Sequence, residues 1–373
     1  MERKRQTASE TEGPGLIDAD VHNAWASQAE LLPYLPKVWH DQWMNGQLIG
    51  NPWYSPLGGV YRKDAATPSG QEPGSDPRYM IKHHLDPYGI DYAILTGHIA
   101  INCSLHPDPD FGTAVASAYN DHMIEEWLKA DPRFKGSLVV NFSDPDAAAK
   151  EIRRVGGHPD IVQVILCSGA RIPFGQRYYH RIYEAAEQLN LPVAIHPGSE
   201  GKGIAYPPTP SGYPTRYMEW HNILPINYMA HINSLICEGV FERFPNLKFV
   251  AIEGGIAWMP HLMWRMDKNY KALRDSAPWL RRLPSEYMLE HIRLTTQPIE
   301  EPANKEHLVQ IFDMIDAGRT LMFASDYPHW DFDNPKLALA GIPREMRKRI
   351  QAANAAELYG LRRKPMLERG GPA

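Results

Sequence analysis

Short apolar runs alternate with segments of helical periodicity along most of the chain. Eight runs predict strands, at residues 16–22, 91–97, 136–142, 162–168, 191–198, 247–255, 292–298 and 320–328. Apolar positions at helical spacing predict helices at residues 111–130, 144–157, 178–190, 217–243, 258–273, 304–318 and 343–361. Because the strands are nearly continuous apolar runs, we expect a parallel sheet that is covered on both faces.

Eight strands, nearly all followed by helices, predict the α/β class and a (β/α)8 TIM barrel with a long insertion after strand 1. A doubly wound sheet is the alternative, but its nucleotide-binding form carries a glycine-rich turn after the first strand. This chain reads "NAWASQAELLPYL" there. We expect one domain at 16–361, with a disordered N-terminal tail at 1–15 and a C-terminal tail at 362–373.

Residues 36–80 follow the first strand, so we expect this lid-like insertion to lie over the catalytic face of the barrel. Its aromatic residues fit two interpretations equally well. They form an apolar lid for a planar or aromatic substrate, or they form the packed interior of the inserted segment or of a subunit interface. These residues are Trp39, Trp43, Trp53, Tyr54 and Tyr61.

Composition narrows the class of partner. The net charge of −5 leaves no basic surface for nucleic acid, and no apolar run is long enough to span a membrane. The three cysteines are far apart, and the N-terminus has no apolar leader. We therefore expect a cytoplasmic protein that acts on a small molecule.

Carboxylates and imidazoles recur where the predicted strands end. Strand one ends in Asp20 and His22, strand five in His196, strand six in Glu253 and strand eight in Asp326. In a TIM barrel these ends meet at one rim, and such side chains are the usual ligands of a divalent ion. Each residue alone is more often a structural or turn-capping residue. Together, Asp20, His22, His196 and Asp326 predict a site for one metal ion.

Several segments resemble the amidohydrolase superfamily, in its amidohydrolase-related branch, which includes aminocarboxymuconate-semialdehyde decarboxylase. The resemblance covers nearly the whole chain. It is carried by "IDADVHN", "HHLDPYGIDYAILTG", "YYHRIYEAAEQLNLPVAIHPG", "GVFERFPNLKFVAIEGGIAWMP", "LTTQPIEEP", "LMFASDYPHWD" and "NAAELYGL". It implies that Asp20, His22 and His196 bind the metal, and that Asp326 binds it and also shuttles a proton.

Two departures from the family pattern affect the reaction that we expect. The first ligand is Asp20, where many relatives have His or Glu. The decarboxylases have His at the end of strand six, where this chain has Glu253. A carboxylate there would repel an acid substrate unless it were protonated. The fourth strand ends in Cys167 and Ser168 without the lysine of two-metal relatives, so we expect a single ion, with zinc first and manganese as the alternative.

These features favour a mononuclear metal-dependent hydrolase that acts on a small cyclic or aromatic substrate. Asp326 would be the general acid and base for a metal-activated water, and Glu253 a second catalytic group. The alternative enzyme is a metal-dependent decarboxylase of an aromatic or muconate-type acid. The third and least favoured hypothesis is a non-enzymatic binding protein built on a barrel scaffold.

Substrate contacts are expected from five residues around the same rim: Trp53, Arg216, His221, Gln297 and His329. The resemblance and the aromatic excursions also imply a homo-oligomer, a dimer or larger.

Overall fold

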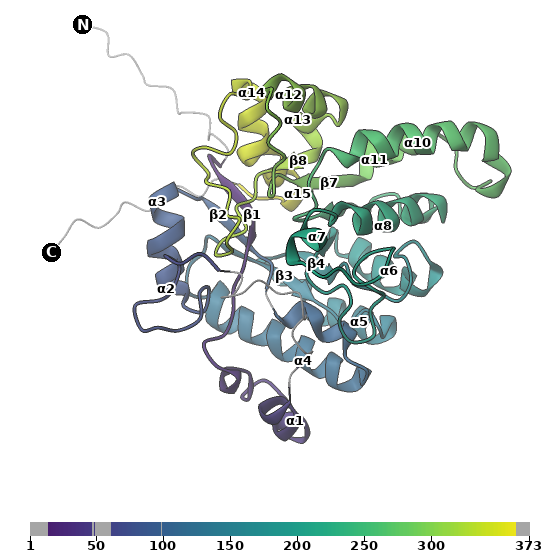
Figure 1. Cartoon of the computed structure of the whole chain (residues 1–373). Coiled ribbons are helices and arrows are strands. Elements are labelled where there is room, and N and C mark those ends of the chain that lie inside the picture. The colour runs from purple at the N-terminus through teal and green to yellow at the C-terminus, as the bar shows by residue number, and fades with distance from the viewer. Residues whose placement is uncertain (1–13, 47, 49–60, 98, 363–373) are drawn as a thin grey trace, which may run out of the picture.

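Eight parallel strands lie side by side in chain order in the computed structural model, which describes residues 14–46, 48, 61–97 and 99–362 (Figure 1). The predicted TIM barrel is confirmed. The strands are β1 (Ile17–Val21), β2 (Tyr92–Leu95), β3 (Phe134–Val139), β4 (Ile161–Cys167), β5 (Val193–His196), β6 (Phe249–Ala251), β7 (Ile292–Thr295) and β8 (Leu321–Met322).

The barrel closes where β1 meets the chain that leaves β8. The Ala19 amide donates to the Phe323 carbonyl at 2.9 Å, and the His22 amide donates to the Tyr327 carbonyl at 2.7 Å. The Asp326 amide donates to the Asp20 carbonyl at 3.1 Å. These bonds continue the sheet beyond the short β8, so both edge strands have partners and neither edge is left open.

Helices surround the barrel and also form its larger excursions (Figure 1). The α-helices are α1 (His40–Asn45), α2 (Pro77–Met80), α3 (Asp86–Tyr88), α4 (Pro109–His122), α5 (Pro145–Val155), α6 (His180–Gln188), α7 (Tyr217–His221), α8 (Pro225–Cys237), α9 (Val240–Arg243), α10 (Trp258–Leu273), α11 (Pro284–His291), α12 (Lys305–Met314), α13 (Ala317–Thr320), α14 (Arg344–Lys348) and α15 (Asn354–Tyr359). Wider π-helical turns join α2 to α3, extend α4, and join α14 to α15 at Ile81–Leu85, Met123–Leu128 and Arg349–Ala353.

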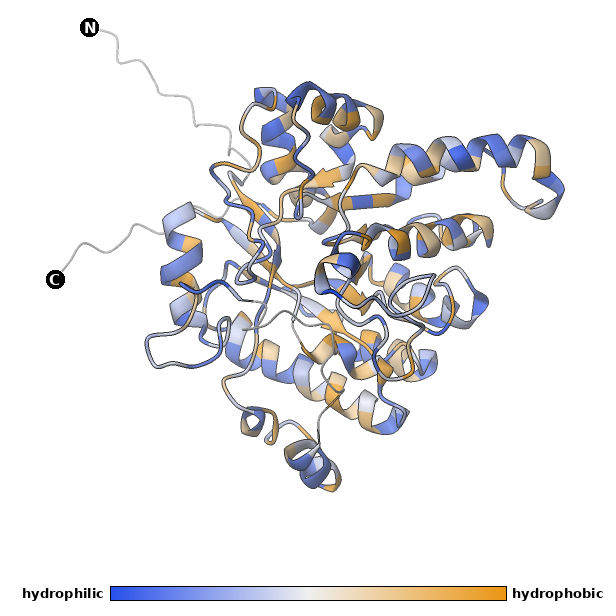
Figure 2. Ribbon diagram, viewed as in Figure 1, coloured by the Kyte–Doolittle hydropathy of each residue, from blue (hydrophilic) through white to orange (hydrophobic). Residues whose placement is uncertain are grey.

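Local sequence explains where several helices begin. Asp108 and Asp144 precede prolines at the first turns of α4 and α5, and their carboxylates accept backbone N–H groups of those turns. Asn304 caps α12 in the same way. Every residue of β4 is buried, as the apolar runs predict. Figure 2 shows apolar residues concentrated along the strands, with polar residues on the outer turns of the helices.

Several elements differ between the prediction and the structure. The helix predicted at 217–243 is divided into α7, α8 and α9, because Pro225 begins α8 and Gly239, at φ +70°, separates α8 from α9. The strand predicted at 320–328 is only two residues long, and its remainder curves away to form the rim. Helix appears at 77–88, where the sequence predicted mostly irregular chain, and Gly89 ends it at φ +66°.

The predicted domain limits remain predictions. The described elements run from β1 to α15, while residues 1–13 and 363–373, most of the two expected tails, lie outside the described residues. In the described part of the chain, no helix combines the length and hydropathy that crossing a bilayer requires.

Replacing Asp108, which caps the start of α4, tests whether these side-chain caps stabilise the helices. Asp108 accepts the amides of Asp110 and Phe111 at 3.0 and 3.2 Å, so Asp108→Ala should lower the free energy of unfolding by about 1 kcal/mol. The urea midpoint measures this loss. Asp313→Ala, at an exposed position late in α12, is the matched control and should lose nothing. Equal losses in both variants would contradict the capping role.

Candidate metal centre

Five buried side chains converge at the C-terminal end of the barrel. Each offers one ligand atom, and these atoms all lie within 4.8 Å of one another. They come from β1, from β5 and from the chain just beyond β1, β6 and β8, so no local segment could assemble them. The five are Asp20, His22, His196, Glu253 and Asp326.

The four predicted ligands contact one another directly. The Nε2 atom of His22 lies 2.9 Å from Asp326 Oδ1 and 3.5 Å from Asp20 Oδ1. The Nε2 atom of His196 lies 3.5 Å from Asp20 Oδ2 and 3.1 Å from Glu253 Oε2. Two imidazoles and three carboxylates thus face a common point, which is a donor set suited to a divalent cation.

Backbone carbonyls fix both imidazole rings. The Nδ1 atom of His22 bonds to the Gly97 carbonyl, and Nδ1 of His196 bonds to the Pro197 carbonyl at 3.0 Å. A carbonyl can only accept, so each Nδ1 carries a proton, and each Nε2 faces the cluster, where it would give its lone pair to a bound metal. Asp20 Oδ2 and Asp326 Oδ2 are buried, and neither receives a well-formed hydrogen bond in the described part of the chain. These residues therefore fit a bound metal ion.

Two ligands of the cluster lie on a backbone with positive φ. Glu253 has φ +57° and Asp326 has φ +60°, values in the left-handed region that non-glycine residues rarely adopt. Such a conformation costs about 1–3 kcal/mol and persists only where the surrounding structure enforces it. Here it turns both carboxylates from the strand ends toward the cluster.

Without a metal, burial and close like charges favour the protonated form of two of the carboxylates, Asp326 and Glu253. Burial raises the pKa of Asp326 well above its ordinary value, and the Glu253, Asp331 and Asp20 carboxylates add to that effect. Burial also raises the pKa of Glu253. Burial opposes protonation of His196, but the Asp20 and Glu253 carboxylates prevail and raise its pKa well above the usual range.

Asp18 supports the cluster from the same strand, at the same side as Asp20. Its carboxylate accepts the Ser325 amide at 2.9 Å and the Ser325 hydroxyl at 2.6 Å, and it lies 2.9 Å from His84 Nε2. The residue that precedes Asp326 is thereby tied to β1 and to the helical segment at 77–88. This contact sets the position of the rim that carries Asp326.

A second group of polar side chains lies beside the cluster. His221 Nε2 is 3.1 Å from Asp331 Oδ2, and the same oxygen accepts Gln297 Nε2 at 2.8 Å. His329 Nδ1 is 2.8 Å from Asp326 Oδ1. His221, Gln297 and His329 are therefore brought to the rim, as predicted. The Arg216 side chain is exposed at the start of α7 and makes no recorded contact with the cluster in the described residues, while Trp53 lies outside them.

Asp331 was missed by the sequence prediction, although it lies at the centre of this second group. Its carboxylate oxygen joins His221 and Glu253 in a set of possible ligand atoms within 4.8 Å. The available signal was a second aspartate five residues after Asp326 in "SDYPHWD". That spacing indicates no face of a helix or strand, so only the folded loop shows that its side chain points inward.

In the described part of the 36–80 insertion, two aromatic residues serve packing and a third borders the candidate site, so each of the two interpretations holds for part of it. Trp43 is buried and stacks edge-on against Trp25, while Trp39 packs against Phe111, so these two serve packing. Tyr61 stacks on His329 with ring centroids 5.7 Å apart, and therefore borders the candidate site. Tyr54, like Trp53, lies outside the described residues.

Comparisons with known proteins agree with this geometry. A family model described as Amidohydrolase matches residues 17–361. The gamma-resorcylate decarboxylase of Polaromonas sp. strain JS666 is 24% identical over 75% of this chain and 86% of its own length. That of Rhodococcus jostii RHA1 is 26% identical over 69% and 80%.

A solved structure shares the fold. The 5-carboxyvanillate decarboxylase of Novosphingobium aromaticivorans DSM 12444 was solved with manganese and 4-hydroxy-3-methoxy-5-nitrobenzoic acid. It superposes with a TM-score of 0.68 at 18% identity, covering 93% of this chain and 97% of that one.

The expectation of hydrolysis is wrong. The similar proteins are decarboxylases, which matches the alternative given by the sequence. The argument for hydrolysis rested on repulsion between Glu253 and an acid substrate. Burial raises the pKa of Glu253, so its carboxyl group holds a proton more readily than an exposed glutamate does, and the repulsion weakens.

Proton competition predicts how metal affinity depends on pH. The raised pKa values of Asp326 and His196 mean that a metal must displace protons from both. The apparent affinity for Mn²⁺ should fall by about tenfold or more between about pH 8 and about pH 6. A competition titration with a fluorescent chelator measures it, with His261→Ala on the exposed side of α10 as control. Affinity that does not change with pH would contradict the coupling.

Proposed function

The chain belongs to the amidohydrolase family, and from that membership we propose that it is a metal-dependent, non-oxidative decarboxylase of an aromatic or muconate-type acid. The observation that carries the proposal is the buried five-residue donor cluster in a chain whose similar proteins are decarboxylases of such acids. The family and the fold both support an enzyme with a small-molecule substrate.

We assign one divalent ion to Asp20, His22, His196 and Asp326. Mixed carboxylate and imidazole ligands suit either zinc or manganese, and manganese is the ion in the similar 5-carboxyvanillate decarboxylase structure. When bound, the ion would supply positive charge that attracts the anionic substrate and stabilises negative charge on it.

Asp326 is the proposed proton donor. Burial and the Glu253 and Asp331 carboxylates favour the protonated form of its carboxyl group in the metal-free protein. With one oxygen of Asp326 on the ion, the other oxygen would accept the proton and deliver it to the substrate. The proton passes from Asp326 to the ring carbon that bears the carboxylate. The bond between that carbon and the carboxylate then breaks, its electron pair restores the ring, and carbon dioxide leaves.

Glu253 is proposed to act as a neutral hydrogen-bond donor to the substrate. Burial, reinforced by the Asp331 and Asp20 carboxylates, raises its pKa, while His196 opposes that shift. A protonated carboxyl group has an O–H to donate and carries no charge that would repel an acid. Glu253 thereby replaces the histidine that the family's decarboxylases place at the end of strand six.

His221 is proposed to contact the anionic end of the substrate. Burial opposes its protonation, but the hydrogen bond with Asp331 raises its pKa. Gln297 Nε2 donates to the same Asp331 oxygen at 2.8 Å. His329 and the ring of Tyr61 form the adjacent wall, which suits a planar substrate. A homo-oligomeric state remains part of the proposal.

A panel of hydroxylated benzoic acids, including 2,6-dihydroxybenzoate and 5-carboxyvanillate, tests the reaction. Purified protein loaded with Mn²⁺ or Zn²⁺ should release carbon dioxide from at least one of them, and a chelator should abolish the release. Asp326→Asn should lower kcat by about 10²–10⁴-fold, since it removes the proton donor. His261→Ala should keep wild-type activity. Metal-loaded protein that decarboxylates no member of the panel but cleaves an ester or amide would overturn the proposal.

The pH profile tests Glu253 separately. Because Glu253 is neutral below its raised pKa, the KM of the wild-type enzyme should rise as pH increases through that value and the carboxyl group ionises. Glu253→Gln stays neutral and keeps a hydrogen-bond donor, so its KM should lack this rise while kcat stays within about tenfold of wild type. Initial-rate kinetics across the pH range measure both. Parallel KM profiles in the two proteins would count against the neutral carboxyl group.

A further inference from the structure

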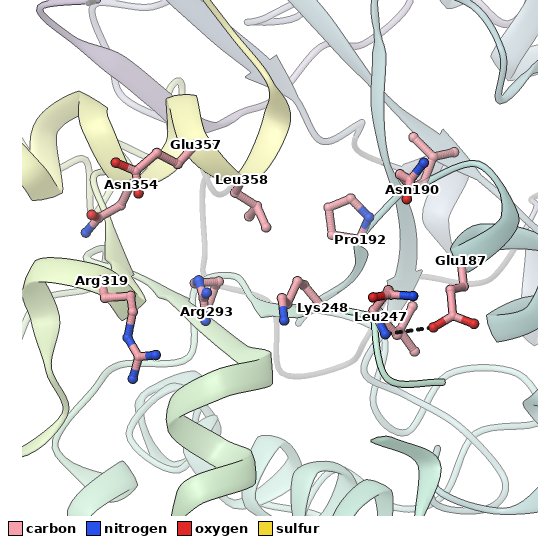
Figure 3. A pocket seen from close by; sticks show the side chains of 12 residues that line it. Glu187, Asn190, Pro192, Leu247, Lys248, Arg293, Arg319, Asn354, Glu357 and Leu358 are labelled. Carbon is pink, nitrogen blue, oxygen red and sulfur yellow. Dashed lines mark hydrogen bonds between the residues drawn. The ribbon is translucent and has the colours of Figure 1, made fainter. Parts of the chain in front are cut away.

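A cavity of about 240 Å³ lies at the end of the barrel opposite the candidate metal centre (Figure 3). Its walls come from the residues just before or at the starts of β5, β6, β7 and β8, and from α15. In the view of Figure 3, Leu358 of α15 and Pro192 lie above the side chains of Lys248 and Arg293. The cavity is too small for a nucleotide cofactor but has room for a small ligand.

Two cations line this cavity without an acidic partner among the described residues. Arg293 uses Nη1 to donate to the carbonyls of Glu290 at 3.1 Å and Ile292 at 2.9 Å. No carboxylate in the described chain forms an ion pair with Arg293 or with Lys248, whose ammonium group also makes no recorded hydrogen bond there. Burial, followed by the nearby Arg319, lowers the pKa of Arg293 to about 10. Burial and Arg293 likewise lower the pKa of Lys248.

The acidic groups at the cavity wall are already engaged. Glu357 forms a two-pronged pair with Arg349 at 2.6 and 2.8 Å. Glu187 accepts the Asn246 amide at 2.8 Å, which Figure 3 marks with a dashed line. Arg319, the third cation at the wall, is paired with Asp316 at 2.9 Å and points away from Lys248 in that view. Glu187 is the one lining carboxylate among the described residues without an ion-pair partner, so the two unpaired cations Lys248 and Arg293 still leave the cavity with a net positive charge.

We propose that this cavity is a binding site for a small oxyanion such as inorganic phosphate, with Lys248 and Arg293 as its binding cations. A partly buried cation without a partner is costly, and an anion in the adjacent space would remove that cost. The planar guanidinium has donors left to reach an oxyanion, and the ammonium group adds a point charge. Because the N-terminal end of a TIM barrel serves stability, bound anion should strengthen the fold and leave the reaction unchanged.

Thermal melting of the metal-loaded protein tests the site. Inorganic phosphate should raise the melting temperature of wild type saturably, whereas chloride at equal ionic strength should not. Lys248→Met should weaken phosphate affinity about tenfold or more. Arg293→Lys, which keeps the charge but loses the planar fork, is a second variant in case the first changes the fold. Lys271→Met, at an exposed position of α10, is the matched control and should respond like wild type.

Enzyme activity, together with a variant of the metal centre, distinguishes phosphate binding in this cavity from phosphate binding at the metal centre. Lys248→Met should keep wild-type activity, since the cavity lies at the other end of the barrel. His196→Ala should lose activity yet keep the response to phosphate. If phosphate stabilises Lys248→Met as strongly as wild type, or if His196→Ala abolishes the response, phosphate binds elsewhere and the proposal is overturned. A wild-type protein with no saturable response overturns it as well.

Discussion

The contact between β1 and the chain that follows β8 is the constraint on which the candidate site depends. It closes the barrel through backbone hydrogen bonds, and it holds Asp20 and His22 beside Asp326, which is over three hundred residues away in the sequence. Asp18 reinforces the junction by binding both the amide and the hydroxyl of Ser325. Because strand β8 itself is so short, these contacts hold β1 against the chain that follows β8, in place of a longer ladder of sheet hydrogen bonds.

Closing the barrel concentrates negative charge in a buried space. Carboxylates that cannot reach water must bind a proton, a cation or a hydrogen-bond donor. Burial and the neighbouring carboxylates raise the pKa values of Asp326 and Glu253, which favours the protonated form of both in the absence of metal. The same property suits a decarboxylase, which must deliver a proton to carbon and accept an acid substrate without repelling it. One electrostatic arrangement therefore supports both metal binding and proton transfer.

The two ends of the barrel carry opposite imbalances of charge. The C-terminal end gathers carboxylates and imidazoles around the metal centre, and the N-terminal end leaves Lys248 and Arg293 facing a cavity. At each end, the strands bring together residues from distant parts of the chain. The first imbalance is proposed to serve chemistry and the second to serve stability, a division that matches the usual roles of the two faces of this fold.

The sequence by itself determined the barrel and the donors that a metal needs. Strand periodicity depends on local alternation of apolar residues, and the strand-end positions of Asp20, His196 and Asp326 follow once eight strands are counted. The breaks in the 217–243 helix also follow from the sequence, through Pro225 and Gly239, whose effect the prediction overlooked. The sequence could not determine the inward turn of Asp331, because the path of a loop depends on surrounding contacts. Nor could it determine the reaction, which depended on the charge state of Glu253. Burial, together with the Asp331 and Asp20 carboxylates that the fold brings close, raises that pKa, since a carboxyl group's protonation depends on its solvent and on neighbouring charges rather than on its position in the chain.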